Sequence, residues 1–140
     1  MKVLAMVLSL LFLSSSANSE NWIYLGNNNG KIVDHHMDID SVKIYKKGFA
    51  KYSNEKYISL RKKSFFDIES QEYQNGVRYD ETVFVVNCDK NSFAVIAATD
   101  YGANDEKLKS AEREIDKSFL KPVQTGTTSE TMVNLACRSV

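Results

Sequence analysis

Residues 79–88 read Tyr-Asp-Glu-Thr-Val-Phe-Val-Val-Asn-Cys, and this stretch decides the fold. Successive side chains of an extended strand point to opposite faces, so Phe84 and Cys88 share one face while Val85 lies on the other. Both faces are apolar near the end of the run, which predicts a strand in the interior of a sheet. Cys88 is therefore expected to point to the same side as the apolar residues of its own face.

The second cysteine, Cys137, lies in a C-terminal stretch that is predicted to form a short helix. Thr127 and Glu130 have the spacing of a capping box at the start of this helix. At about 100° per residue, one stripe of the helix contains the residues that can pack on a sheet; these are Met132, Val133, Ala136 and Cys137.

The N-terminus has the pattern of a secretory signal peptide. Lys2 precedes the apolar run 3–13, and the small polar stretch 14–19 follows it. The run is about half as long as the roughly 20 residues of a membrane-spanning helix, so a retained anchor is the weaker interpretation.

The expected cleavage site precedes Glu20, with Ala17 and Ser19 as the small residues before the cut, and a cut after Ala17 is the second choice. No cysteine lies in this region, which argues against lipid attachment there. We therefore expect residues 1–19 to be a signal peptide and residues 20–140 to form one domain. The expected location is the periplasm, the cell surface or the medium.

An exported chain meets an oxidising compartment, where a pair of cysteines is more often a disulfide than a metal site. The two cysteines allow one intramolecular pairing, Cys88 with Cys137. Closing a loop of about 50 residues contributes roughly 4 kcal/mol in the chain-entropy description. The bridge also requires the helix stripe to lie on the sheet face that carries Cys88. A zinc site with the two histidines is the rival, but no C-x-x-C pair is present.

Other stretches of the chain have strand-like composition beside turn signals. Two of them flank Lys46-Lys47-Gly48 and predict a hairpin. The strand-like stretches are 22–25, 42–45, 49–52, 57–60 and 93–98. Residues 104–118 favour a partial helix instead, because Leu108, Ala111 and Ile115 recur at helical spacing, although that stripe is thin.

Several short motifs, taken in order, resemble the surface-adhesin protein E family over nearly the whole mature chain. They are Trp22, Met37-Asp38-Ile39-Asp40-Ser41-Val42, Asn87-Cys88, Phe119-Leu120-Lys121-Pro122-Val123, Thr127-x-x-Glu130 and Cys137-Arg138. The resemblance implies an α+β fold, a single antiparallel sheet of about six strands with a C-terminal helix packed on one face and tied to it by the disulfide. It also implies binding of host extracellular proteins at the bacterial surface.

One cluster has the composition of a metal site, Asp34-His35-His36 with Asp38 and Asp40. Adjacent side chains of an extended segment point to opposite sides, so His35 and His36 rarely face one ion together. A solvated loop that ends at the next strand is the preferred interpretation, with a metal or haem ligand as the alternative. We predict no cofactor and no metal.

The sequence also lacks the motifs of common enzymes. It has no G-x-S-x-G elbow, no phosphate-binding G-x-x-x-x-G-K-S/T loop and no G-x-G-x-x-G turn. Its 18 basic and 18 acidic side chains cancel, which disfavours nucleic acid as a partner. No enzymatic activity is expected.

The basic triplet Arg61-Lys62-Lys63 is the candidate partner-binding site, for an acidic protein or a glycosaminoglycan. A solvated surface is the alternative interpretation of such a run. The expected function is that of an exported binding module with a protein partner, and a periplasmic envelope-maintenance or assembly protein is the alternative. Because uncovered sheet edges invite pairing, a homodimer is also expected to be possible.

Overall fold

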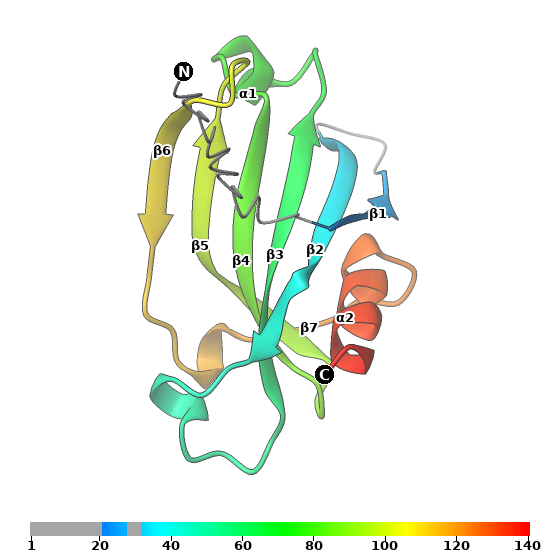
Figure 1. Ribbon diagram of the computed structural model, residues 1–140, viewed down its shortest axis with the longest axis vertical. Coiled ribbons are helices and arrows are strands. Elements are labelled where there is room, and N and C mark those ends of the chain that lie inside the picture. Colours follow the sequence, from blue (N-terminus) through cyan, green and yellow to red (C-terminus); the bar gives the residue numbers. More distant parts are fainter. Residues whose placement is uncertain (1–20, 28–31) are drawn as a thin grey trace, which may run out of the picture.

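The computed structural model describes residues 21–27 and 32–140, and the predicted signal peptide lies outside these residues. Long strands and two short α-helices make up the described chain (Figure 1). The strands are β1 (Trp22–Gly26), β2 (Ile32–Ile44), β3 (Tyr57–Phe66), β4 (Tyr79–Asn87), β5 (Ser92–Tyr101), β6 (Lys107–Glu112) and β7 (Lys121–Pro122). The helices are α1 (Gln71–Gln74) and α2 (Thr128–Arg138), with 3₁₀ turns η1 (Gly48–Ala50) and η2 (Lys117–Phe119).

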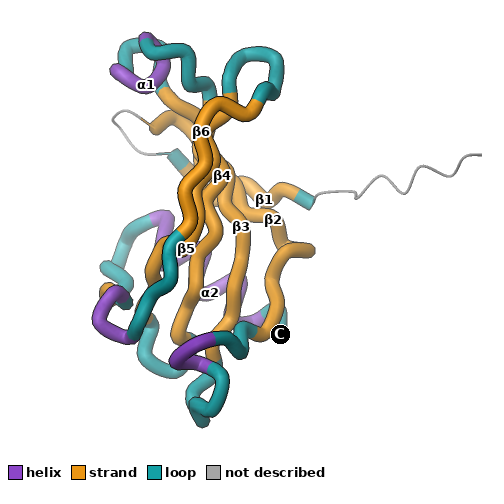
Figure 2. The backbone as a smooth tube through the Cα atoms, turned by 90° about the vertical axis from the view of Figure 1, so that its left-hand side faces the viewer, coloured by secondary structure: helices purple, strands orange, loops and turns teal. Residues whose placement is uncertain are grey.

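The strands of the described residues belong to one antiparallel sheet, and β1 to β6 cross it in sequence order. The order is β1-β2-β3-β4-β5-β6, and β7 pairs with the first two residues of β5, Ser92 and Phe93. Seen from the β6 edge, the strands bend along their length instead of lying in a plane (Figure 2). The predicted single antiparallel sheet with a C-terminal helix is confirmed, and β4 lies in the interior of the sheet as its two apolar faces predicted.

Helix α2 packs on one face of the sheet, here called the helix face. Met37, Leu60 and Phe84 point to this face from β2, β3 and β4, and they join the helix residues Met132 and Ala136 in one buried cluster. Burying side chains of this size contributes roughly 1.5–3 kcal/mol each. The helix face therefore holds the main core of the domain.

The predicted disulfide joins Cys88 to Cys137, with 5.7 Å between the two Cα atoms. The start of α2 is also as predicted, because the hydroxyl of Thr127 accepts a hydrogen bond from the backbone N–H of Glu130 at 3.2 Å. At the other end, the ammonium of Lys56 donates to the carbonyl of Cys137 at 3.1 Å. Both ends of the helix and its bridge are thus fixed by specific contacts.

The opposite face of the sheet carries a second, smaller core near the end of β4 that leads to Cys88. Val85 and Tyr57 are buried there together with Ala50 of η1. Ile115 and Leu120, from the segment that connects β6 to β7, pack against them. At this end of the sheet both faces are covered, which explains why β4 is apolar on both sides.

The partial helix expected over residues 104–118 is wrong. Residues 107–112 form β6, which pairs with β5 and brings Ala98 opposite Ala111. All six residues of β6 are exposed, so the apolar stripe has no surface on which a helix would pack. Pairing with the free edge of β5 satisfies the backbone groups instead, and tertiary context overrides local propensity.

Two further expectations about the first half of the chain are wrong. Residues 49–52 do not form a hairpin with 42–45, because the partner of β2 is β3, with Ile44 opposite Ile58. Phe49 turns away in η1 and packs its ring edge-on against Tyr57 at 5.2 Å. The tract from Asp34 to Asp40 is part of β2 and not a loop.

Candidate functional site

The predicted binding triplet lies in the middle of β3, where strand geometry divides it between the two faces. Lys62 stands opposite Met37 and Thr82 and points to the helix face. Arg61 and Lys63 point to the other face. The structure therefore does not bring the three cations of Arg61-Lys62-Lys63 onto one surface.

Lys62 lies at the margin of the main core, beside Met37 on β2. Its ammonium lies 5.3 Å from the centroid of the Phe84 ring. Burial lowers the pKa of this ammonium, and the carboxylate of Asp80 opposes that effect. The ammonium of Lys62 therefore lies beside an aromatic ring of the main core.

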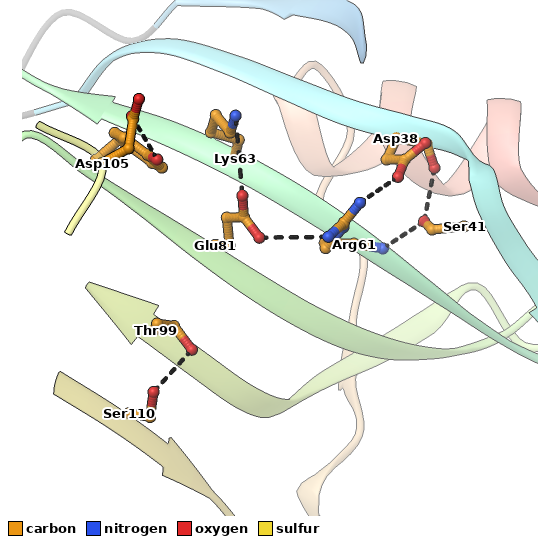
Figure 3. Close-up of polar contacts among 9 residues, drawn as sticks. Asp38, Ser41, Arg61, Lys63, Glu81, Thr99, Asp105 and Ser110 are labelled. Carbon is orange, nitrogen blue, oxygen red and sulfur yellow. Dashed lines mark hydrogen bonds and ion pairs between the residues drawn. The ribbon is translucent and has the colours of Figure 1, made fainter. Parts of the chain in front are cut away.

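Arg61 and Lys63 form a chain of ion pairs with acidic side chains of the neighbouring strands (Figure 3). The guanidinium of Arg61 lies 2.6 Å from the carboxylate of Asp38 on β2 and 3.5 Å from Glu81 on β4. The ammonium of Lys63 lies 3.8 Å from the other oxygen of Glu81. Charges from three strands are thereby held in fixed positions.

A local irregularity of β2 sets the position of Asp38. The pairing register with β3 shifts between Asp38 and Lys43. Within that interval the hydroxyl of Ser41 donates to the carbonyl of Asp38 at 2.6 Å and accepts from the backbone N–H of Arg61 at 2.8 Å (Figure 3). Asp38 and Ser41 therefore bind the side chain and the backbone of the same arginine.

A row of rings crosses the same face beside these charges. Each ring comes from a different strand, from β1 to β5, and meets the next at a centroid distance of 5.3, 5.7, 5.4 or 4.8 Å. The row is Tyr24, His36, Phe65, Tyr79 and Tyr101. Contacts of this geometry contribute roughly 0.5–1.5 kcal/mol each beyond the area they bury.

The charges and the rings are in contact through Trp22, Lys63 and Tyr79. The ammonium of Lys63 lies 4.3 Å from the centroid of the Trp22 ring and 4.9 Å from that of Tyr79. The guanidinium of Arg61 lies 5.2 Å from the same indole. The hydroxyl of Tyr79 donates to the carboxylate of Asp105 at 2.8 Å, and burial, followed by this bond, raises the pKa of Tyr79.

We call this half of the sheet the open face, because α2 packs on the opposite side and several side chains of this half keep contact with solvent. The exposed fractions are 30% for the Arg61 side chain, 17% for Lys63 and 54% for Tyr24. Its residues are Trp22, Tyr24, His36, Asp38, Arg61, Lys63, Phe65, Tyr79, Glu81 and Tyr101. The two strongly basic groups are matched by two carboxylates, so the face is mixed in polarity and not strongly basic.

Sequence reasoning found Arg61 and Lys63 but missed the aromatic members of the open face. They lie between positions 22 and 101, and only the strand pairing brings them together. A usable signal existed within each strand, because Trp22 and Tyr24 alternate with Ile23 and Leu25, as do Arg61 and Lys63 with Leu60 and Lys62.

The two histidines point to opposite faces, as the extended segment predicted. His36 belongs to the open face, whereas His35 is buried on the helix face with its Nδ1 atom 3.2 Å from the hydroxyl of Ser64. Burial, with a smaller effect from Lys62, lowers the pKa of His35 to about 4. Among the residues that the structure describes, no three histidine, cysteine or acidic side chains are grouped as metal ligands.

Comparison with known families gives one match. The family described as surface-adhesin protein E matches residues 16–138, nearly the whole chain. None of the curated proteins or solved structures compared with the chain matches it significantly. Within residues 21–27 and 32–140, no helix combines the length and the apolar character needed to cross a membrane.

Proposed function

The chain belongs to the surface-adhesin protein E family, and on that premise we propose that it is an exported, non-enzymatic protein that binds a host extracellular protein through its open face. The observation that carries the proposal is the composition of this face. Trp22, Tyr24 and Arg61 are of the residue types that most often dominate the binding energy of protein interfaces.

The open face is also preorganised for binding. Arg61 is held by Asp38, Glu81 and the ring of Trp22 before any partner arrives. A side chain that is already fixed loses less conformational freedom when it enters an interface. Tyr24 supplies an exposed ring beside these groups.

The charge of the face favours a protein partner over a strongly anionic polymer. The carboxylates of Asp38 and Glu81 lie within 4 Å of the cations of Arg61 and Lys63. A glycosaminoglycan would meet these carboxylates as well as the cations, and its attraction would be weakened. A protein surface with both signs of charge matches the arrangement better.

We assign different tasks to the members of the basic triplet. Arg61 and Lys63 contact the partner, and Lys62 supports the sheet from the helix face. Its position over Phe84 supports this division.

A binding assay with matched tyrosine variants tests the proposal. The purified protein is applied to immobilised host matrix and serum proteins, and Tyr24→Ala is compared with Tyr52→Ala, whose ring is 87% exposed in the loop before β3. We expect Tyr24→Ala to weaken binding by about tenfold or more and Tyr52→Ala to leave it unchanged. Equal effects of the two variants, or no binding to any host protein, contradict the proposal.

Surface display is tested separately, with intact cells. Protease added outside the cells should degrade the protein while a periplasmic marker survives. Complete protection of the protein, with recovery in the periplasmic extract, would contradict an adhesin role and leave an envelope-maintenance role in its place.

A further inference from the structure

A cavity of about 270 Å³ lies at the end of the sheet away from the open face. One cross-strand row forms its wall, because Tyr57 stands opposite Asn87, Asn87 opposite Ser92 and Ser92 opposite Pro122. The row thus runs from β3 through β4 and β5 to β7. None of these residues belongs to the open face, so the cavity is a separate site.

Tyr57 is the unusual member of this wall. Its side chain is 98% buried, given a relative exposure of 2%, and its ring packs on Phe49. No hydrogen bond joins its hydroxyl to another group in the part of the chain that the structure describes, and the hydroxyl is not among the polar atoms that are cut off from solvent. The hydroxyl of a tyrosine whose ring is buried usually has a hydrogen-bond partner. Because Tyr57 lines the cavity, a molecule in the cavity can supply that partner.

The side chain of Asn87, in contrast with that of Tyr57, forms hydrogen bonds through both its oxygen and its nitrogen. Its side-chain carbonyl accepts hydrogen bonds from the backbone N–H groups of Asp89 and Lys90 at 3.0 and 3.1 Å. Its amide donates to the carboxylate of Glu55. Asn87 therefore shapes the turn between β4 and β5 and holds the backbone of Lys90 beside the cavity.

Two lysines from different segments line the cavity, Lys90 from this turn and Lys117 from η2. The ammonium of Lys90 lies 3.3 Å from Glu55. Lys117 forms no ion pair or hydrogen bond through its ammonium among the described residues, and its charge, after those of nearer groups, helps to lower the pKa of Glu55. Of the two ammonium groups that line the cavity, that of Lys90 is paired with a carboxylate and that of Lys117 is not paired with a described one.

The remaining lining is apolar. Leu120 and the ring of Pro122 face the cavity from the segment around β7. Ligand sites generally combine such apolar walls with a few converging polar groups. The cavity is several times larger than the roughly 30 Å³ that one molecule occupies in liquid water, so it has room for a small organic molecule.

We propose that this cavity binds a small organic acid with a single carboxylate. The carboxylate lies against the ammonium of Lys117, within reach of Lys90, and accepts a hydrogen bond from the hydroxyl of Tyr57. The hydrocarbon part lies against Leu120 and Pro122. One negative charge matches the single lining ammonium that has no described ion-pair partner, whereas a phosphate dianion carries more charge than this ammonium does. No reaction is involved.

Titration of the oxidised protein with benzoate, followed by the amide signals of Ser92 and Lys117 in two-dimensional NMR, tests the proposal. Benzoate should shift these signals along a saturable curve, while benzyl alcohol, which has the same ring without the charge, should not. We expect Tyr57→Phe and Lys117→Gln each to weaken the binding by about fivefold to tenfold. Lys121→Gln removes an exposed lysine of β7 and should leave the binding unchanged.

If Tyr57→Phe fails to bind benzoate, its NMR spectrum shows whether the variant is folded. The loss of a hydroxyl that has no partner should not unfold the protein. The carboxylate proposal is overturned if benzoate produces no saturable shift, if benzyl alcohol binds equally well, or if inorganic phosphate alone binds. It is also overturned if both variants bind benzoate as well as the parent protein.

Discussion

The two faces of the sheet carry different kinds of side chain over the same strands. On β3, Leu60 faces α2 and is 1% exposed, whereas Arg61, the next residue, faces the other way with 30% of its side chain exposed. On β4, Phe84 enters the main core, and Glu81 joins the ion pairs of the open face. A single strand therefore contributes to folding with one set of residues and presents a second set to solvent.

The difference indicates a division of tasks. The helix face carries the main apolar core, is closed by α2 and is tied by the Cys88–Cys137 bridge, which are features that stabilise a small domain. On the open face, Asp38 and Tyr79 are buried, whereas Arg61 and Lys63 keep part of their side chains in solvent. Ion pairs that solvent reaches contribute little to stability. Substitutions on the first face should change stability, and substitutions on the second should change binding.

The largest expected effect on stability comes from removing the bridge. Replacing Cys88 and Cys137 by alanine opens a loop whose ends are 49 residues apart. The free energy of unfolding, measured by urea denaturation, should fall by about 4 kcal/mol. A variant as stable as the parent would show that α2 stays on the sheet without the bridge.

Removal of a core side chain of α2 should have the next largest effect. Met132 is 1% exposed among sheet residues, and Met132→Ala should lower the free energy of unfolding by about 3 kcal/mol. Asn134→Ala, on the exposed side of the same helix, is the control and should change it by less than about 0.5 kcal/mol. If both variants lose the same stability, the helix does not pack as described.

The buried His35 should make the helix face sensitive to acid. Its pKa is about 4 in the folded protein and 6.5 in its ordinary state. Between these values the unfolded chain binds a proton that the folded chain does not, so the free energy of unfolding falls as the pH is lowered from 6.5 to 4. The loss is at most about 3 kcal/mol.

Urea denaturation at several pH values measures this dependence, with His35→Gln as the comparison. The variant lacks the titrating ring, so its stability should fall less over the same interval. Identical pH profiles for the two proteins would mean that His35 is protonated equally easily in the folded and unfolded states.

Much of the helix face was predictable from sequence, because its signals are periodic and local. The alternation of Phe84 and Val85 gave the phase of β4, and the capping pair Thr127 and Glu130 gave the start of α2. Export and the count of two cysteines then predicted the bridge. Each of these signals lies within one element of the chain.

The open face and β6 were less predictable, because their structure depends on pairing between distant strands. Trp22 meets Lys63 only when β1, β2 and β3 are placed side by side. All of residues 107–112 are exposed, so no alternation of buried and exposed side chains marks them as a strand that pairs with the edge of β5. Strand alternation would have placed Lys62 on the face opposite Arg61 and Lys63, but the predicted strand ended at residue 60, whereas β3 continues to Phe66.

The division of tasks is tested most directly by measuring affinity and stability in the same two variants. Against one immobilised host protein, the cysteine-free variant, under conditions in which it is folded, should bind within about twofold of the parent. Tyr24→Ala should keep its free energy of unfolding within about 0.5 kcal/mol and lose about tenfold in affinity. The opposite pattern, with Tyr24→Ala destabilised and fully able to bind, would contradict the account.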